Sequence, residues 1–356
     1  MSNKWVVYLL TLAVFLIGTI EYIISGILYM VAADLGIPTS SAGALVTAFA
    51  LSAAIGAPVV IAATIQMDRK KILLIMLGIF ILSSFLVYFS PSFEMILVAR
   101  VIQGLSGGAA TVIAMAVATR LVEVQNRGRA IGTILMGLSS SLVLGVPAGT
   151  FLSEVVGWRT LFILIGMLTL IPLLVVFTRV PSIIEQKTIT LGMQLSILKD
   201  KKIVLALATT LFYIGGYSTL FTYIAPFLQA SAKLSVAALS SILLLFGLCS
   251  FFGSKFGGVI ADTKGPKFMI YTGLSVQAGM LLLVTWAYSL IYAIIPLIMI
   301  WMVATWATSP AQQLYLVSLV PHSPDIALSV NTSFIQFGFR SRLGYRGAGD
   351  QRFLNR

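Results

Sequence analysis

The sequence predicts an all-α membrane protein with ten complete transmembrane helices and an incomplete eleventh. Its composition is the first reason, because 59% of the residues are hydrophobic and only 10% are charged, whereas soluble domains carry about 25% charged residues. The second reason is that apolar stretches of about 20 residues, the length that crosses a bilayer as a helix, recur along almost the whole chain. The alternating segments of a membrane β-barrel do not occur.

The predicted spans fall into two groups on either side of a polar stretch. Six spans precede residues 180–201, which we interpret as a cytoplasmic linker, and four complete spans follow it. We therefore expect a six-helix bundle over 1–179, an incomplete second bundle over 202–339 and a basic tail over 340–356. The spans are predicted at 5–30, 40–65, 72–90, 92–118, 128–152, 159–178, 202–229, 236–260, 267–288 and 291–318.

Lysine and arginine residues are concentrated in alternate loops, and this pattern predicts the orientation. Loops such as 69–71 and 120–129 are basic, whereas the intervening loops hold only Arg159 and Lys233. Because basic loops stay on the cytoplasmic side of a membrane, we expect a cytoplasmic N-terminus. The net charge of +12 then reflects topology, and no nucleic-acid partner is expected.

Few residues are available for catalysis or metal binding. The chain has one cysteine, Cys249, and one histidine, His322, which argues against a disulfide framework and against a metal site. Paired acids, a histidine-based site and a phosphate-binding loop are also missing from the sequence. We expect a protein that is not an enzyme and that carries no cofactor or metal.

Two ionisable residues interrupt the apolar helices. Glu21 lies in the first predicted span and Arg100 in the fourth, and charges at bilayer depth usually mark transport pathways. Each residue lies about 8 or 9 positions from the outer end of its helix, roughly 14 Å deep, so the two are predicted to meet across a cavity. Burial raises the pKa of a carboxylate, and a nearby guanidinium lowers it. A carboxylate balanced in this way can take up a proton from one side of the membrane and release it on the other. The alternative is a static ion pair between the helices.

The surroundings of Arg100 form a motif. The pattern Leu97-x-x-Arg100-x-x-Gln103-Gly104 resembles the helix-4 motif of the major facilitator superfamily. Within that superfamily the chain is most similar to the twelve-helix drug/proton antiporters and to the sugar or nucleoside efflux permeases. The resemblance extends to about Phe339 and implies a two-bundle fold, with a proton-relay or gating role for Arg100.

Two further motifs support the resemblance. Gly145-Val-Pro147-Ala-Gly149 resembles the antiporter motif of helix 5, and its proline predicts a kink that shapes a gate or is merely tolerated. The resemblance also implies state-dependent salt bridges at the cytoplasmic helix ends. The residues concerned are Asp68 and Arg69 after the second span, and Asp262, Gly265 and Lys267 after the corresponding span of the second bundle.

Aromatic and amide side chains are candidates for the substrate cavity. Tyrosines of the seventh helix, next to two glycines, are predicted to line a cavity for planar or hydroxylated substrates. Anchoring at the membrane interface is the alternative for each tyrosine, and helix–helix hydrogen bonding is the alternative for each glutamine. The candidates are Tyr22, Tyr213, Tyr217, Tyr223, Gln312 and Gln313.

These features predict a proton-coupled secondary active transporter that exports a small organic compound, such as a drug, sugar or nucleoside-like molecule, by alternating access. We expect a monomer in the bacterial cytoplasmic (inner) membrane, whose partners are its substrate, protons and the lipid bilayer. Two alternatives stay open. One is a proton-coupled uptake symporter with the same fold, and the other is a truncated, inactive transporter fragment.

The C-terminal end does not match the rest of the pattern. An eleventh span begins near Asp325 but holds about 14 residues, fewer than the roughly 20 that a bilayer requires. The last 17 residues contain five arginines, and each arginine at a helix centre costs about 2.5–3.5 kcal/mol. We expect that the reading frame shifts near Arg340, so that the chain is C-terminally truncated and 340–356 is out of frame. A natural basic tail is the alternative.

Overall fold

Helices make up nearly all of the chain that the structure describes. The structure is a computed structural model, and it describes residues 3–64, 66–183, 199–232, 236–286, 291–321 and 323–340. The predicted basic tail beyond Arg340, its predicted frame shift and the predicted linker between 184 and 198 lie outside these residues.

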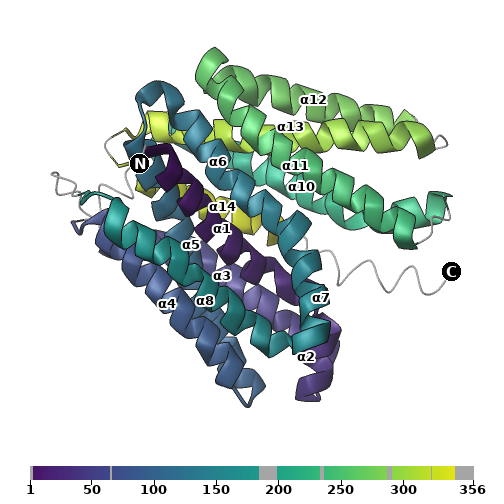
Figure 1. The fold of residues 1–356 in the computed structure, drawn as a ribbon. Helices are drawn as coiled ribbons and strands as arrows, with labels where there is room; N and C mark the ends of the chain where they lie inside the picture. The colour runs from purple at the N-terminus through teal and green to yellow at the C-terminus, as the bar shows by residue number, and fades with distance from the viewer. Residues whose placement is uncertain are drawn as a thin grey trace.

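The helices follow one another along the chain in two sets (Figure 1). The first half contains α1 (Asn3–Gly26), α2 (Leu28–Leu35), α3 (Thr39–Ala63), α4 (Arg69–Phe89), α5 (Phe93–Leu121), α6 (Arg127–Ser140), α7 (Val146–Val156) and α8 (Trp158–Arg179), with the short helix η1 (Val124–Asn126) before α6 and the π-helix η2 (Ser141–Gly145) after it. The second half contains α10 (Lys201–Ala232), α11 (Val236–Lys264), α12 (Pro266–Trp286), α13 (Ile291–Leu319) and α14 (Pro324–Arg340).

The described part of the chain contains ten helices that are long and apolar enough to cross a membrane. This confirms the predicted all-α membrane fold and its ten spans. η1, α6, η2 and α7 together make one of them, Val124–Val156. α14 is 17 residues long, which is shorter than a full span, and it corresponds to the incomplete eleventh.

The fifth span changes its winding where the sequence predicts a kink. η2 is a π-helical segment that ends directly before the first turn of α7, which contains Pro147. Proline lacks a backbone N–H and clashes with the preceding turn, and a wider π-turn accommodates both effects. Gly145 also lies against α1, since a Cβ atom there would be 2.3 Å from Thr19 Oγ1. Gly149 is similarly close to Ile23, at 2.7 Å from its Cδ1 atom. The motif therefore lets α1 pack tightly on a distorted helix.

Two helix pairs make the most extensive contacts between the two halves. α6 packs along α11, and α3 packs along α14, so that α6 and α14 lie between the two sets of helices (Figure 1). The α6–α11 contact is close, because a Cβ atom on Gly258 would lie 2.3 Å from the carbonyl oxygen of Gly128. In the other pair the Ser333 hydroxyl donates a hydrogen bond to the Ala54 carbonyl. These two seams enclose the centre of the molecule.

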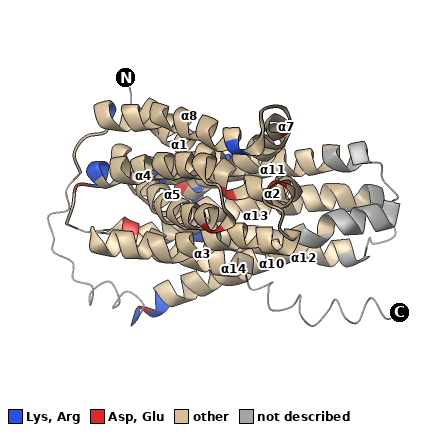
Figure 2. Cartoon of the chain, turned by 90° about the horizontal axis from the view of Figure 1, so that it is seen from below, with Lys and Arg blue, Asp and Glu red and all other residues tan. Residues whose placement is uncertain are grey.

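Charged residues gather at the ends of the helices. Figure 2 shows a ribbon that is mostly uncharged, with blue segments at the end of the bundle nearest the N-terminus. We call this the basic end, and it contains residues 64–71, 120–129 and 262–267. Arg100 is an exception, because it lies within a span and its side chain is fully buried.

Candidate transport site

Arg100 is held by main-chain carbonyl groups. Its Nη1 atom donates to the Ile20 carbonyl at 3.0 Å, and its Nε atom donates to the Leu45 carbonyl at 3.3 Å. Its Nη2 atom reaches the main-chain oxygen of Glu21 at 3.4 Å, and the guanidinium lies 4.5 Å from the centre of the Phe49 ring. A buried guanidinium needs several acceptors, and here they come from α1 and α3. Arg100 therefore ties these two helices to α5.

The rest of the helix-4 motif supports this arrangement. Gln103 accepts a hydrogen bond from Arg100 at 3.1 Å and donates one to the Ser84 hydroxyl of α4 at 3.2 Å. At Gly104 a Cβ atom would lie 2.2 Å from the Phe49 carbonyl oxygen, so only glycine allows α5 to approach α3 this closely. Gln103 thus orients the guanidinium, and Gly104 brings the α3 carbonyl groups within its reach.

The side chains of Glu21 and Arg100 do not form a direct ion pair in the described structure. The Glu21 carboxylate instead accepts a hydrogen bond from Gln336 Nε2 of α14, at 3.0 Å. Arg100 contacts only the main chain of Glu21, because its donors are already directed at carbonyl oxygens. The static ion pair that was the alternative is therefore absent between these two side chains, although both residues lie at the same level of the fold.

Glu21 and Gln336 line a cavity between the halves. Tyr22, Tyr213, Tyr217 and Gln313 line the same cavity, as the sequence predicts for them. Its volume of about 90 Å³ is small compared with the roughly 300–1,000 Å³ of typical small-molecule sites. The walls must therefore separate before a substrate of ordinary size fits.

Two other cavity candidates have different positions. Gln312 is buried between helices, where its Nε2 atom donates to the Ala206 carbonyl at 2.5 Å and to the Thr210 hydroxyl at 3.1 Å. It joins α13 to α10 and does not line the cavity, so the alternative of helix–helix hydrogen bonding holds for this residue. The side chain of Tyr223 lies outside the described residues.

Aromatic rings cover one wall of the cavity. Tyr217 stacks on Trp301 with ring centres 5.7 Å apart, and it meets Trp306 and Phe339 edge-on at 6.1 Å each. Rings in these geometries attract one another beyond their simple area of contact. The packed cluster gives the second half a rigid apolar surface that faces Glu21 of the first half.

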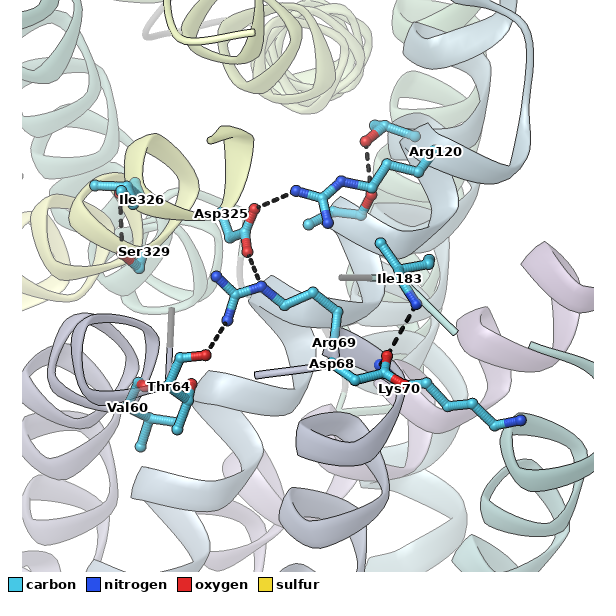
Figure 3. A network of polar contacts seen from close by, with 12 residues as sticks. Val60, Thr64, Asp68, Arg69, Lys70, Arg120, Ile183, Asp325, Ile326 and Ser329 are labelled. Carbon is cyan, nitrogen blue, oxygen red and sulfur yellow. Dashed lines mark hydrogen bonds and ion pairs between the residues drawn. The ribbon is translucent and has the colours of Figure 1, made fainter. Parts of the chain in front are cut away.

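A buried ionic cluster joins the halves at the basic end (Figure 3). Asp325, in the first turn of α14, lies 2.5 Å from Arg69 Nε and 3.0 Å from Arg120 Nη2. Both Asp325 and Arg69 are fully buried, and Arg69 also donates to the Thr64 carbonyl at 3.0 Å. Removing one partner of such a cluster leaves a buried charge uncompensated. The cluster therefore fixes α14 to α4 and α5.

Asp68 does not form the predicted salt bridge. It caps α4 by accepting from the Lys70 amide at 2.9 Å, and it also accepts from the Ser182 hydroxyl at 2.6 Å and the Ile183 amide at 2.9 Å. Burial alone would raise the pKa of Asp68, but these hydrogen bonds outweigh it and hold the pKa below its ordinary value. Asp68 thus anchors the segment that follows α8, while the neighbouring Arg69 makes the ionic contact.

Asp262 joins the halves at the other seam. Its carboxylate accepts hydrogen bonds from the Gly128 amide at 2.6 Å and the Arg129 amide at 2.8 Å, at the N-terminus of α6. A carboxylate is favoured there by the free amide groups and by the helix dipole. Lys267 lies over the Tyr315 ring, 5.7 Å from its centre, and Gly265 has φ 90° at the turn between α11 and α12. The main-chain amides of Gly128 and Arg129 therefore lie closer to the Asp262 carboxylate than any basic side chain does.

Three functional residues were missed by sequence reasoning. Gln336 and Asp325 both occur in α14, the most amphipathic of the late helices, where polar residues interrupt an apolar stretch of the sequence and were a usable signal. Arg120 was counted only as a loop charge. Within the described ranges, no three His, Cys, Asp or Glu side chains come together as metal ligands.

The fold and the site together are those of a multi-span membrane transporter, with apolar helices around a small, mostly apolar cavity that contains Glu21, and with polar contacts between two halves. The chain belongs to the Major Facilitator Superfamily (MFS), whose family model matches residues 10–339.

Comparisons with known proteins agree with this assignment. The chain is 36% identical over 347 residues to the uncharacterized MFS-type transporter YbcL of Bacillus subtilis, covering 98% of this chain and 89% of that protein. It is 26% identical over 340 residues to a probable sugar efflux transporter of Mannheimia succiniciproducens, covering 93% and 83% of the two proteins. The structure of the proton:xylose symporter XylE, bound to 6-bromo-6-deoxy-D-glucose, matches with a TM-score of 0.79 at 17% identity, covering 99% of this chain and 90% of that one. This last likeness concerns the fold.

Proposed function

We propose that the protein is a proton-coupled secondary active transporter that exports a small organic compound by alternating access. The observation that carries the proposal is the hydrogen bond from Gln336 to the Glu21 carboxylate, at 3.0 Å. It places one ionisable group in the cavity wall, in contact with both halves of the molecule. Acids at this depth usually mark pathways for ions or protons.

Glu21 carries the proton in this mechanism. As a carboxylate it only accepts hydrogen bonds, whereas a protonated carboxyl group also donates one. Protonation therefore changes both the charge of the cavity and the pattern of bonds between α1 and α14. Arg100 keeps the main chain of Glu21 in place, so the change affects the side chain and the opposite half. No covalent step is required.

Alternating access requires the seams at the basic end to separate. We assign residues 1–179 and 202–339 to the two moving bundles and 180–201 to the cytoplasmic linker. The Asp325 cluster and the Asp262 contact would break when the cavity opens toward the basic end. We infer from the basic loops that this end, and the N-terminus, lie in the cytoplasm of a bacterial cell.

Two observations favour export. The helix-5 motif of the antiporters has a structural counterpart in η2 and the close packing of Gly145 on α1. In addition, the Mannheimia relative is named as a probable sugar efflux transporter. We propose that the protein works as a monomer.

A gradient-driven transport assay tests this function. The purified chain in liposomes, given a pH gradient and a panel of labelled sugars, nucleosides and amphipathic drugs, is expected to move at least one compound opposite to the proton flow. A protonophore should abolish the movement. Movement in the same direction as the protons would indicate an uptake symporter, and no gradient-driven movement of any compound would contradict the proposal.

A further inference from the structure

A groove lies on the outer side of the second half, between α10 and α12. It has a volume of about 560 Å³, and the buried ring of Trp301 in α13 lies at its base. Phe212, which lines it, is 78% exposed within a membrane span, so the groove opens toward lipid. The apolar and small residues along its sides are Leu205, Ala208, Phe212 and Gly216 of α10, and Leu274, Ala278 and Leu281 of α12.

No described helix covers this groove. In the first half, α8 packs along both α4 and α1. In the second half, α12 packs along α13 as α4 packs along α5, but α12 lies at the outer edge of the molecule (Figure 1). Lipid tails are as apolar as leucine side chains, so in a bilayer an open apolar groove of this kind is filled by acyl chains.

The length of the groove matches one leaflet of the bilayer. Its lining residues on α10 extend from Leu205 to Tyr217, which is roughly 18 Å along the helix axis. Half of the hydrocarbon core of a bilayer is about 15 Å thick. Leu205 lies one turn after the start of α10 at Lys201, so the groove extends from that helix end to about the middle of the membrane.

A lysine precedes the groove on each of its two flanking helices. Lys201 lies four, seven and eleven positions before groove residues of α10, and Lys267 lies seven, eleven and fourteen positions before those of α12. These spacings put residues on the same face of a helix. Both lysines are exposed, and each continues the groove-lining face of its helix toward the membrane surface.

Both lysines lie at the same end of the groove. Tyr315 of α13 packs against the apolar cluster that contains Ile203 of α10 and against the cluster that contains Ile270 of α12. The Lys267 ammonium lies 5.7 Å from the centre of the Tyr315 ring, and Lys201 is two positions before Ile203. Tyr315 therefore connects the two lysine-bearing helix ends.

The acids near these lysines are bonded to main-chain amides. Asp200 accepts from the Lys202 amide at 2.7 Å, and Asp262 accepts from the amides at the start of α6. Neither Lys201 nor Lys267 forms an ion pair with another residue that the structure describes. The N-termini of α10 and α12 add the positive ends of two helix dipoles. This end of the groove therefore favours an anion.

We propose that the groove binds an anionic phospholipid from the leaflet at the basic end. One acyl chain lies between α10 and α12 over Trp301, and the phosphate group accepts hydrogen bonds from Lys201 and Lys267. Tyr213 and Tyr217 line both the groove and the central cavity, so the bound chain packs against the outer side of the wall that encloses the cavity. The binding depends neither on a proton gradient nor on the direction of transport.

Native mass spectrometry of the full chain tests the lipid class. The probes are dioleoylphosphatidylglycerol, dioleoylphosphatidylcholine, which has the same chains on a neutral headgroup, and glycerol 3-phosphate, which has no chains. We expect the anionic lipid to bind at least about tenfold more tightly than the neutral one, because each lysine near an anionic lipid contributes about fivefold. Glycerol 3-phosphate should not bind.

Three results would overturn the proposal. Equal affinity for the two lipids would remove the role of the lysines, and binding of glycerol 3-phosphate as tight as that of the anionic lipid would remove the role of the groove. A dimer of the chain that excludes the lipid would assign the groove to a second copy. The same mass spectra report all three.

Paired variants test the headgroup contact. Lys201→Gln combined with Lys267→Gln should reduce the preference for the anionic lipid to less than about threefold. Lys71→Gln combined with Lys255→Gln removes the same charge from exposed lysines of α4 and α11, outside the groove, and should leave the preference unchanged. An equal preference in both double variants would contradict the assignment.

A second pair tests the acyl-chain contact. A Cβ atom on Gly216 or on Gly279 meets nothing within 4 Å, so both positions have room for a side chain, but only Gly216 lines the groove. Gly216→Leu should weaken the binding of both lipids at least about fivefold, and Gly279→Leu less than about twofold. Unchanged binding in Gly216→Leu would place the chain elsewhere. If a variant fails to fold, the comparison of the three probes on the unmodified chain still decides.

Discussion

Several charged side chains in this protein form most of their hydrogen bonds with main-chain groups. Arg100 is satisfied by carbonyl oxygens of α1 and α3, and Asp262 by amide groups at the start of α6. The contacts of Arg100 hold helices together at a depth where water is not available to compensate a charge. They also explain why Arg100 can lie close to Glu21 while the carboxylate remains available to Gln336.

Replacing Arg100 tests its role as a helix clamp. In Arg100→Lys a single ammonium group cannot reach the carbonyl groups of both Ile20 and Leu45 with the geometry of a guanidinium. We expect a loss of about 3 kcal/mol, since each hydrogen bond to a charged group contributes about 1.5–3 kcal/mol. Chemical unfolding in detergent measures this loss. The exposed Arg179→Lys serves as the control, and equal stability of the two variants would contradict the clamp.

The residue scale is also where sequence reasoning succeeded least. The motif indicated that Arg100 is important, but no sequence pattern shows that its acceptors are main-chain carbonyl groups. Likewise, Gln312 and Gln313 are adjacent and chemically identical, and only the rotation of α13 separates a helix contact from a cavity residue. Tyr213 and Tyr217 were easier to assign to one cavity from the sequence, because they are four positions apart and so share a helix face.

At the scale of elements, the short helix α14 carries contacts both at the basic end and in the cavity wall. Its first turn carries Asp325, its middle carries Ser333, and its last turns carry Gln336 against Glu21. The helix therefore reaches from the ionic cluster at the basic end to the cavity. Movement of α14 against α3 would change both regions together, which is the property that a coupling element needs.

The ionic cluster provides a direct test of that view. Asp325→Asn removes the carboxylate from Arg69 and Arg120, and breaking a buried pair in this way costs about 3–5 kcal/mol. We expect the α3–α14 seam to open more readily from the basic end, which labelling of a cysteine placed at Ala54 within that seam measures. Glu123→Gln, an exposed acid at the same end, should leave the labelling rate unchanged. A rate equal to that of the unmodified protein in Asp325→Asn would refute the role of the cluster.

The Asp68 anchor predicts a dependence of stability on pH. Its pKa is lowered in the folded protein, so it stabilises the fold above its ordinary pKa of about 3.9. This contribution is lost as the pH falls through the lowered value. The thermal unfolding midpoints of the unmodified protein and Asp68→Asn should therefore differ equally at pH 7 and pH 5, and converge below about pH 4. A gap that stays constant to pH 3 would show that Asp68 stabilises the fold by some other means.

The existence and positions of the elements were the most predictable part of the structure. The predicted span 291–318 agrees with α13 (Ile291–Leu319), and 92–118 agrees with α5 (Phe93–Leu121), because the length of an apolar stretch is a local property. The pairing of α3 with α14 and of α6 with α11 depends on contacts between distant residues. Without a structure, the sequence offered no sign of these pairings.

At the scale of the whole molecule, the two seams determine how the halves can move. In the α6–α11 seam, backbones approach so closely that a Cβ atom on Gly258 would meet the Gly128 carbonyl at 2.3 Å. In the α3–α14 seam, hydrogen bonds and the Asp325 cluster make the connection. Close contact between backbones leaves no flexible side chains to absorb a displacement, so the seams either stay packed or separate.

A glycine substitution tests the closed α6–α11 seam. Gly258→Ala forces the two backbones apart, and overpacking of this kind costs about 1–3 kcal/mol. Gly279→Ala in α12 is the matched control, because a Cβ atom there meets nothing within 4 Å and alanine favours the helix by roughly 0.5–1 kcal/mol. Thermal unfolding should place the first variant below the unmodified protein and the control at or above it. Equal midpoints for the two variants would mean that the seam is looser than described.

The central claim is that Glu21 couples substrate movement to protons, and the most direct measurement is Glu21→Gln in liposomes under two conditions. With a pH gradient, the variant should accumulate no substrate, since glutamine cannot carry a proton. Without a gradient, exchange of labelled for unlabelled substrate should persist, since the cavity and both seams remain. Glu154→Gln, an exposed acid in α7, should retain both activities. Gradient-driven accumulation by Glu21→Gln at the rate of the unmodified protein would contradict the account.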